Sequence, residues 1–183
     1  VLSQRKDNVA LLKRMVQRQD DLLDSAEDME GVEMFFKAQR TVFDDAKKRL
    51  ASILKERDYF ATDADTLNVI STMSTILAMP KPYSRIGELP ELVQKVKTAY
   101  DGLLDMKREE VAENIRQCMQ DVHQLASEAR DAGTLLHQAD DHFVNKREAA
   151  KTATSLTELD AMITQLLNYK DTICRRMEVM SAS

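Results

Sequence analysis

Residues 86–132 read IGELPELVQKVKTAYDGLLDMKREEVAENIRQCMQDVHQLASEARDA, and this stretch decides the fold. Apolar residues recur in it every three or four positions, which predicts a single helix about 65–70 Å long at 1.5 Å per residue. The spacing follows an eleven-residue repeat, in which Val93, Leu104 and Ile115 align, as do Tyr100, Val111 and Val122. Eleven residues make very nearly three full turns of an α-helix. The line of apolar side chains is therefore expected to run nearly parallel to the helix axis. A stripe of this length needs other long helices beside it.

The amino-acid composition also indicates a helical protein. The 183 residues include four Gly, three Pro, no Trp and only 5% aromatic residues, whereas strong helix formers dominate. This excludes the Gly-rich turns and β-branched strands of α/β enzymes. We therefore predict an all-α fold: an elongated bundle of five to six helices, with one very long central helix and coiled-coil-like packing. Residues 1–183 are interpreted as a single helical domain, and the start at Val1 suggests a fragment of a larger protein.

Other helices are predicted on both sides of the central one. The first is expected over residues 3–29 and is ended by Gly31, the second runs over residues 32–58, and the third covers residues 63–79. Thr62 and Asp65 resemble a capping box for the third helix. A helix of about twenty residues follows Gly133. The last one starts at the capping box Ser155-Leu-Thr-Glu158.

The last helix carries a heptad pattern with apolar residues at the a and d positions: Leu156, Leu159, Ile163, Leu166, Ile173, Met177 and Met180. Heptads of this length need a partner helix. The partner is either internal or a second copy, so a homo-oligomer through 156–180 is one expectation.

The loop from Pro80 to Pro90 is rigid, because Pro80 and Pro82 have fixed φ and force the residues before them to extend. Its structural interpretation is that Tyr83 and Ile86 fold back onto the bundle as a plug. Its functional interpretation is a docking loop for a protein partner, made by Tyr83, Arg85 and Ile86.

No catalytic, cofactor-binding or metal-binding residues are predicted. The four glycines are far apart, which excludes a phosphate-binding loop and a dinucleotide-binding fingerprint. Cys118 and His123 are five residues apart on different sides of one helix, so they do not form a catalytic pair. The only cluster with metal-ligand residue types is His137, Asp140, Asp141 and His142, and a solvated polar face explains it better.

The net charge and the hydropathy of the chain limit the kinds of partner, such as nucleic acids or membranes, that it is expected to bind. The net charge of −5 does not indicate a nucleic-acid surface, and no apolar run approaches the roughly 18 residues of a membrane span. Cys118 and Cys174 occupy apolar helix positions and are expected to be reduced core residues. We therefore expect a cytoplasmic protein with protein partners.

Two segments carry a family resemblance. They are residues 34–60, from Met-Phe-Phe-Lys-Ala-Gln-Arg to Arg-Asp-Tyr-Phe, and residues 76–92, which include Pro80-Lys-Pro-Tyr83 and Leu89-Pro-Glu-Leu92. Together they resemble the helical C-terminal region of BrxC, the large P-loop ATPase family of BREX phage-defence systems. The resemblance covers residues 32–132 well and the rest loosely.

This resemblance implies a bacterial phage-resistance protein that hydrolyses ATP in a domain absent from this chain. The chain itself would be non-catalytic and bind no cofactor. Its expected function is an interaction or assembly module that contacts other defence components. The alternative is a stand-alone cytoplasmic coiled-coil adaptor or scaffold.

Overall fold

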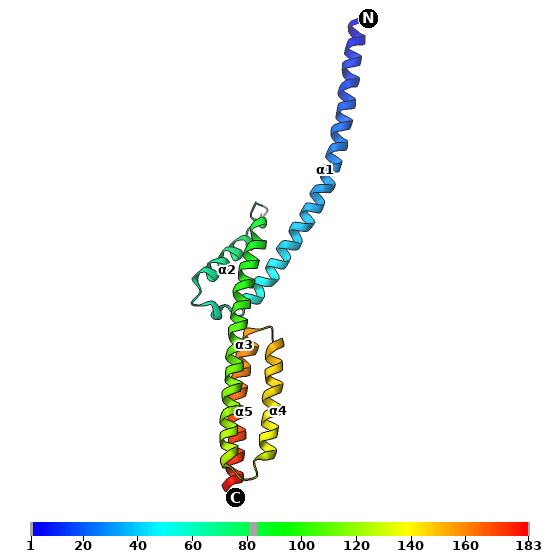
Figure 1. Cartoon of the computed structure of the whole chain (residues 1–183). Helices are drawn as coiled ribbons and strands as arrows, with labels where there is room; N and C mark the ends of the chain where they lie inside the picture. The colour runs from blue at the N-terminus through cyan, green and yellow to red at the C-terminus, as the bar shows by residue number, and fades with distance from the viewer. Residues whose placement is uncertain (1, 81–83, 183) are drawn as a thin grey trace.

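The computed structural model describes residues 2–80 and 84–182, without the side chains of residues 2–3 and 19–32. The described residues form helices joined by short turns and contain no strand. The elements in chain order are α1 (Leu2–Leu54), η1 (Arg57–Phe60), α2 (Ala64–Leu77), η3 (Ile86–Glu88), α3 (Leu89–Glu128), α4 (Gly133–Thr152) and α5 (Leu156–Ala182). The predicted all-α, elongated fold is confirmed (Figure 1).

The central helix of the body is α3, which runs along its whole length (Figure 1). It is 40 residues long, shorter than predicted, because Ile86–Glu88 form a separate short helix and the α-helix ends at Glu128. Pro90 lies in its first turn, where the missing N–H is not needed. The eleven-residue repeat is buried as expected, with Leu104, Val111, Ile115 and Val122 in the core.

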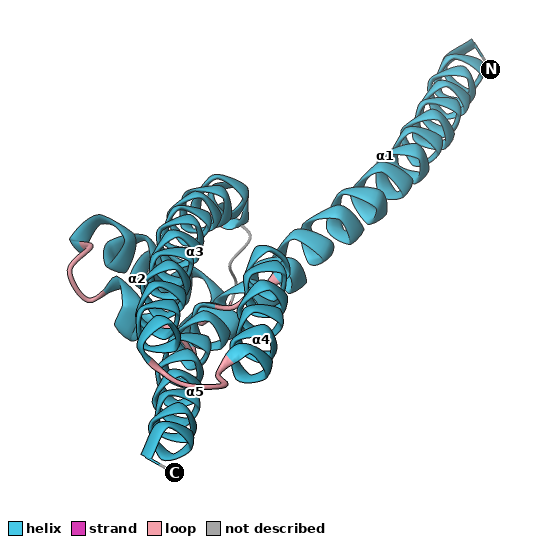
Figure 2. Ribbon diagram, turned by 60° about the horizontal axis from the view of Figure 1, so that its bottom comes forward, coloured by secondary structure: helices cyan, strands magenta, loops and turns pink. Residues whose placement is uncertain are grey.

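The first two predicted helices are one helix, α1, and the predicted break at Gly31 is wrong. A single glycine costs a helix only about 1 kcal/mol, and no proline lies before Pro80 to stop it. With 53 residues, α1 is longer than α3. Figures 1 and 2 show its N-terminal part projecting away from the other helices.

The start of α2 also differs from the prediction. Asp63, not Thr62, is the N-cap, and its side chain accepts a hydrogen bond from the Thr66 backbone N–H at 3.1 Å. Its other carboxylate oxygen accepts from the Thr66 hydroxyl. The hydrogen bonds with Thr66 hold the pKa of Asp63 below its usual value. A carboxylate is the better cap here because it also opposes the positive end of the helix dipole.

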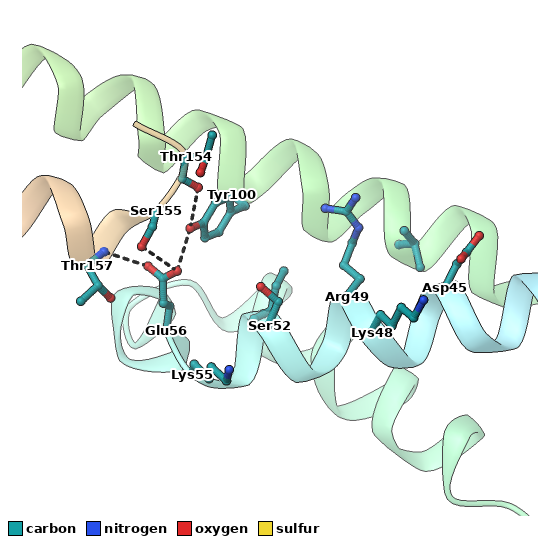
Figure 3. A pocket seen from close by; sticks show the side chains of 12 residues that line it. Asp45, Lys48, Arg49, Ser52, Lys55, Glu56, Tyr100, Thr154, Ser155 and Thr157 are labelled. Atoms are coloured by element: carbon teal, nitrogen blue, oxygen red, sulfur yellow. Dashed lines mark hydrogen bonds between the residues drawn. The ribbon is translucent and has the colours of Figure 1, made fainter. Parts of the chain in front are cut away.

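Two apolar cores share α3. The first lies where the end of α1, α2 and the first half of α3 meet, and it is built on Ala46, Leu50, Ile53, Phe60, Ile70, Met73, Ile76, Leu89 and Val96. Tyr100 and Leu103 pack against both cores. The end of α1 also lies beside the start of α5 at this junction (Figure 3).

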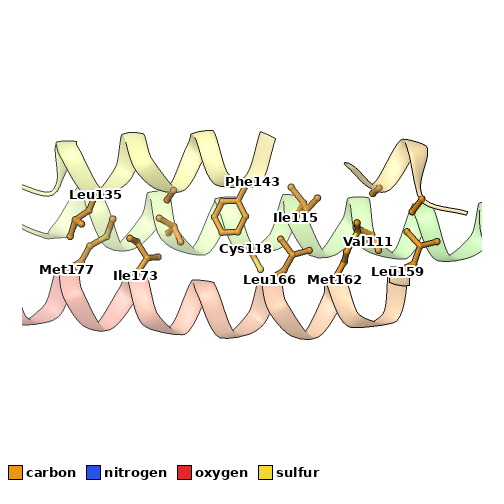
Figure 4. Packing of buried hydrophobic residues seen from close by; sticks show 14 of the residues in the cluster. Val111, Ile115, Cys118, Leu135, Phe143, Leu159, Met162, Leu166, Ile173 and Met177 are labelled. Atoms are coloured by element: carbon orange, nitrogen blue, oxygen red, sulfur yellow. The ribbon is translucent and has the colours of Figure 1, made fainter. Parts of the chain in front are cut away.

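The second core fills the three-helix bundle of α3, α4 and α5 (Figure 4). Five of the seven heptad residues of α5 are buried here, Ile163 is half-buried and Met180 is exposed. The partner of the heptad seam in this structure is therefore internal. Self-association through 156–180 would have to displace α3 or α4 from it.

Ser155 begins α5 as predicted, since the Glu158 backbone N–H donates to its hydroxyl at 3.4 Å. Cys118 is buried and Cys174 half-buried, and both are free thiols. Burial raises the pKa of both thiols, so neither is a ready nucleophile. In the part of the chain that the structure describes, no helix has the length and apolar content needed to cross a bilayer.

Candidate functional site

The N-terminal part of α1, residues 2–36, forms an arm that leaves the body (Figure 1). Every described side chain in residues 4–18 and 33–36 is exposed, and the first fully buried residue of α1 is Ala46. The arm is helical because more than half of its residues are strong helix formers such as Leu, Gln, Lys, Arg, Met and Glu, and it contains no proline. Most helical stability in proteins comes from packing, so an arm with an exposed apolar face is expected to have a partner.

The apolar face of the arm consists of large side chains at helical spacing. Val9, Leu12 and Val16 lie three and four residues apart, and Leu12 is 61% exposed. Leu11 and Met15 widen the same face. Side chains exposed singly are normal, but a contiguous exposed apolar stripe marks an interaction site.

A second apolar group lies where the arm nears the body. Met34, Phe35 and Phe36 are all exposed, Met34 by 74%. The rings of Phe35 and Phe36 meet edge to face, with their centroids 6.2 Å apart. Phe36 has the spacing of the buried stripe of α1, seven residues before Phe43, but the core begins further along the helix.

A polar cleft of about 1040 Å³ lies at the junction of α1, α3 and α5 (Figure 3). It is lined by Asp45, Lys48, Arg49, Ser52 and Ile53 of α1, by Lys55 and Glu56 just after α1, by Val93 and Tyr100 of α3, and by Thr154, Ser155 and Thr157 at the start of α5. Its charges are mixed, because Lys48, Arg49 and Lys55 lie beside Asp45 and Glu56 along one side of the cleft (Figure 3). None of these lining residues is a histidine or a cysteine.

Glu56 closes one end of this cleft and joins three elements. It is 9% exposed, and its carboxylate accepts from the Tyr100 hydroxyl at 2.8 Å and from the Thr157 backbone N–H at 3.0 Å. The Ser155 hydroxyl donates to it at 3.4 Å. Glu56 therefore supplies α5 with a capping carboxylate from α1. Burial and the hydrogen bond to Glu56 raise the pKa of the Tyr100 hydroxyl.

A second polar cluster stabilises the same junction. Asp160 accepts from the Tyr59 hydroxyl at 2.5 Å and pairs with the Lys107 ammonium at 2.6 Å. The hydrogen bond from Lys107, then that from Tyr59, holds the pKa of Asp160 below its usual value. The Arg108 guanidinium donates to the Ala153 carbonyl at 2.7 Å. These contacts fix the bundle to the part of the body that carries the arm.

The three residues of the predicted docking loop are not brought together on one surface. Ile86 is buried, as the plug interpretation predicts, and Arg85 forms an ion pair with Glu88 at 2.8 Å. Tyr83 lies outside the described residues, so docking through this loop stays a prediction.

The His and Asp residues considered as metal ligands do not converge. His137 faces Asp141 at 3.5 Å, Asp140 pairs with His123 at 2.7 Å, and His142 turns inward. Over the described residues, no group of three or more His, Cys, Asp or Glu side chains could hold a metal. The interpretation as a solvated polar face fits the exposed His137 and Asp141, but it is wrong for His142, which turns into the bundle.

His142 packs inside the bundle instead. Its ring stacks on Tyr169, with centroids 3.6 Å apart and 12° between the planes, and it meets Phe143 edge to face. Its Nε2 is buried without a hydrogen-bond partner among the described residues. Burial, with a smaller effect from Lys146, lowers the pKa of His142 below its usual value.

We expect His142 to make the bundle less stable as the pH falls below about 6.5. Because its pKa is depressed in the folded state, the unfolded chain takes up the proton first, and stability falls until the folded pKa is reached. His142→Phe should remove this part of the pH dependence in urea titrations at pH 7 and pH 5. The exposed His137→Phe is the control. A chain that becomes more stable on acidification would show that the imidazolium gains more from the Tyr169 ring than it loses by burial.

The arm and the end of α1 lie in the segment that matches a family model. Residues 1–57 match the family model of the BREX ATP-binding protein BrxC alpha helical domain. The predicted resemblance to BrxC is confirmed over this segment, which contains all of α1 and Glu56. The Pro80–Pro90 loop, whose motif also suggested BrxC, lies outside the match. No solved structure matches the chain.

Proposed function

We propose that this chain is a non-catalytic interaction and assembly module of a BREX ATPase and that its arm is the docking element. The observation that carries the proposal is the coincidence of two features in one segment. Residues 1–57 match the BrxC helical family, and the same segment exposes the apolar face of Val9, Leu12 and Val16. The proposal has three further parts. The full-length protein binds and hydrolyses ATP, it is cytoplasmic, and this chain contacts other components of the defence system.

The body supports a scaffolding function for the arm. Glu56 and the Tyr59–Asp160–Lys107 cluster join the base of α1 to the three-helix bundle. A rigid base fixes the direction of the arm relative to the body. A partner bound to the arm is then held in a fixed position relative to any domain attached to the body. The alternative, a stand-alone adaptor, uses the same arm but has no ATPase attached.

Phage restriction in a strain with an intact BREX system tests the proposal. Leu12→Asp in the full-length protein is expected to lower restriction at least about tenfold in plating efficiency, because one buried charge costs well over 1.4 kcal/mol of binding. Ala10→Asp is the matched control, since it places the same charge in the same exposed helical turn on the opposite side. Both proteins should show equal helix content by circular dichroism.

Two outcomes would contradict the proposal. One is full restriction by Leu12→Asp, which would remove the arm from the function. The other is ATP hydrolysis by the purified 183-residue chain, which would make it an enzyme. Sequencing the reading frame upstream of Val1 distinguishes a module of a BREX ATPase from a stand-alone adaptor. A Gly-x-x-x-x-Gly-Lys-Ser/Thr motif in that frame would support the ATPase, because this motif forms a phosphate-binding loop.

A further inference from the structure

We propose that the polar cleft at the junction of α1, α3 and α5 binds a short acidic segment of a partner protein in an extended conformation. The inference goes beyond the proposed function, because the cleft lies in the body and includes no residue of the arm. Its volume of about 1040 Å³ is at the upper end of the range that is usual for ligand sites. A cleft of this size has room for several residues of a peptide.

Three cations line the cleft without a charged partner. The side chains of Lys48, Arg49 and Lys55 are exposed, and over the described residues none of them forms an ion pair or a hydrogen bond. Lys107, at the same junction, is instead paired with Asp160 at 2.6 Å. Cations that line a cleft and have no partner in their own chain attract an anionic ligand.

The two acids of the cleft lie at its ends (Figure 3). Asp45 and Glu56 are separated by about 16 Å along α1 and the turn that follows it. The Glu56 carboxylate already accepts three hydrogen bonds from this chain, so its charge is stabilised internally. The acidic side chains of a bound segment are therefore expected to lie between Asp45 and Glu56, beside the cations.

The floor of the cleft is apolar. Ile53 of α1 is only 4% exposed, and Val93 and Tyr100 of α3 are half-buried. Successive side chains of an extended peptide point to opposite sides of its backbone. A peptide in which acidic and apolar residues alternate can therefore place its apolar side chains on this floor and its acidic side chains towards the cations.

The spacing of the cations suits such a peptide. Lys48 and Lys55 are seven residues apart, which is about 10 Å along a helix. Three residues of an extended peptide cover the same distance at about 3.3 Å per residue. Arg49 extends from α1 towards α3 (Figure 3). Acidic residues at alternate positions therefore lie within reach of these long side chains.

The same spacing argues against a small anion or a nucleic acid. A single phosphate group is bound by donors that converge on it, whereas Lys48 and Lys55 approach the cleft about 10 Å apart. A nucleic-acid strand brings a phosphate with every nucleotide, and Asp45 and Glu56 would lie against these charges. An acidic peptide avoids both acids and also uses the apolar floor.

Fluorescence anisotropy with labelled peptides tests the site. The probes are seven-residue peptides in which Glu alternates with Leu, Val or Phe, titrated with the purified 183-residue chain. We expect saturable binding of at least one of them. Its affinity should fall at least about tenfold when Gln replaces every Glu, because the charge pairs are lost. If none of the peptides binds, or if the Gln peptides bind equally well, the proposal is overturned.

Arg49→Glu is expected to lower the affinity for the bound peptide at least about tenfold, because a repelling charge replaces an attracting one. Lys47→Glu is the matched control, since Lys47 is exposed on the same turn of α1 but does not line the cleft. It makes the same change in net charge and should alter the affinity less than about twofold at 0.15 M salt, where charges outside the cleft are screened. Equal losses in the two variants would show nonspecific attraction to the basic run and overturn the cleft as the site.

Reversing the charges on both partners gives an independent measurement. A peptide in which Lys replaces Glu should bind a chain with Lys48→Glu and Arg49→Glu at least several-fold more tightly than it binds the unchanged chain. A gain of this kind cannot come from a loss of folding. If there is no gain, these two side chains do not contact the peptide and the proposal is wrong.

Two competitors decide the class of ligand. We expect neither inorganic phosphate nor single-stranded DNA to displace the peptide at concentrations near the peptide's own Kd. Displacement by phosphate would reduce the cleft to a site for small anions. Displacement by DNA, with the DNA affinity also lost in Arg49→Glu, would make it a nucleic-acid site. Either result would overturn the assignment to an acidic peptide.

Failure of this inference is distinguishable from failure of the proposed function. Leu12→Asp should leave peptide binding unchanged, because the arm is not part of the cleft. If the peptides do not bind but Leu12→Asp loses phage restriction, only the cleft inference is wrong. If the peptides bind as described but Leu12→Asp restricts phage normally, the cleft stands and the docking function of the arm is wrong.

Discussion

Replacing Phe143 with alanine is expected to lower the free energy of unfolding by about 3–5 kcal/mol, the usual cost of removing a buried aromatic side chain. Phe143 is completely buried between α4 and its two neighbours (Figure 4). Its ring meets Tyr169 of α5 edge to face, with centroids 5.5 Å apart. Truncation would leave a cavity where all three helices meet. Urea unfolding followed by circular dichroism measures the change.

The neighbouring Val144→Ala is the matched control, because Val144 is 44% exposed and should change stability by less than about 0.5 kcal/mol. Phe143→Leu keeps most of the volume and should cost about 1–2 kcal/mol. A loss of less than 1 kcal/mol for Phe143→Ala would mean that α4 is not packed on α3 and α5 as described.

The bundle could be predicted from sequence because its signals are periodic. The eleven-residue repeat of α3 and the heptads of α5 both indicate which helix face is buried. Apolar residues spaced three and four apart indicate an amphipathic α-helix. The direction of Phe143 followed from the same kind of pattern in α4. What the pattern did not give was the partner. The heptads of α5 were equally compatible with a second copy, and only the structure places them on α3 and α4.

The predicted break at Gly31 failed because a glycine is a weak signal by itself. A glycine ends a helix when the chain must turn there, and that need comes from tertiary contacts. The described side chains nearest to this glycine, in residues 4–18 and 33–36, are exposed and so impose no turn, and the helical preference of the sequence prevails. The prediction was wrong because it assumed that every apolar stripe lies in one compact bundle.

The candidate site was missed for the same reason. Val9, Leu12 and Val16 were recognised as one helix face, but periodicity cannot tell whether a face is covered by this chain. About nine and a half turns separate Val16 from Leu50, so in a straight helix they point to nearly opposite sides. That offset, together with the change from basic to acidic residues near Gln19, was the available signal for a separate arm.

Glu56 could not have been found from sequence, because its partners are about 44 to 101 residues away. We expect Glu56→Ala to lower the free energy of unfolding by about 2–4 kcal/mol, since it removes a carboxylate that accepts three hydrogen bonds and caps α5. The backbone N–H of Thr157 would lose its acceptor, and the Tyr100 hydroxyl could donate only to the Thr154 carbonyl, at 3.4 Å, while still accepting from the Leu156 backbone N–H at 3.2 Å. Urea unfolding of the variant measures the loss.

The control for Glu56 is Asp45→Ala, an exposed acid on the same cleft, which should change stability by less than about 0.5 kcal/mol. A double-mutant cycle with Tyr100→Phe isolates the contact. Its coupling energy should be about 0.5–3 kcal/mol if the two side chains act through one hydrogen bond. Strictly additive losses would show that Glu56 holds α5 through Thr157 and Ser155 alone.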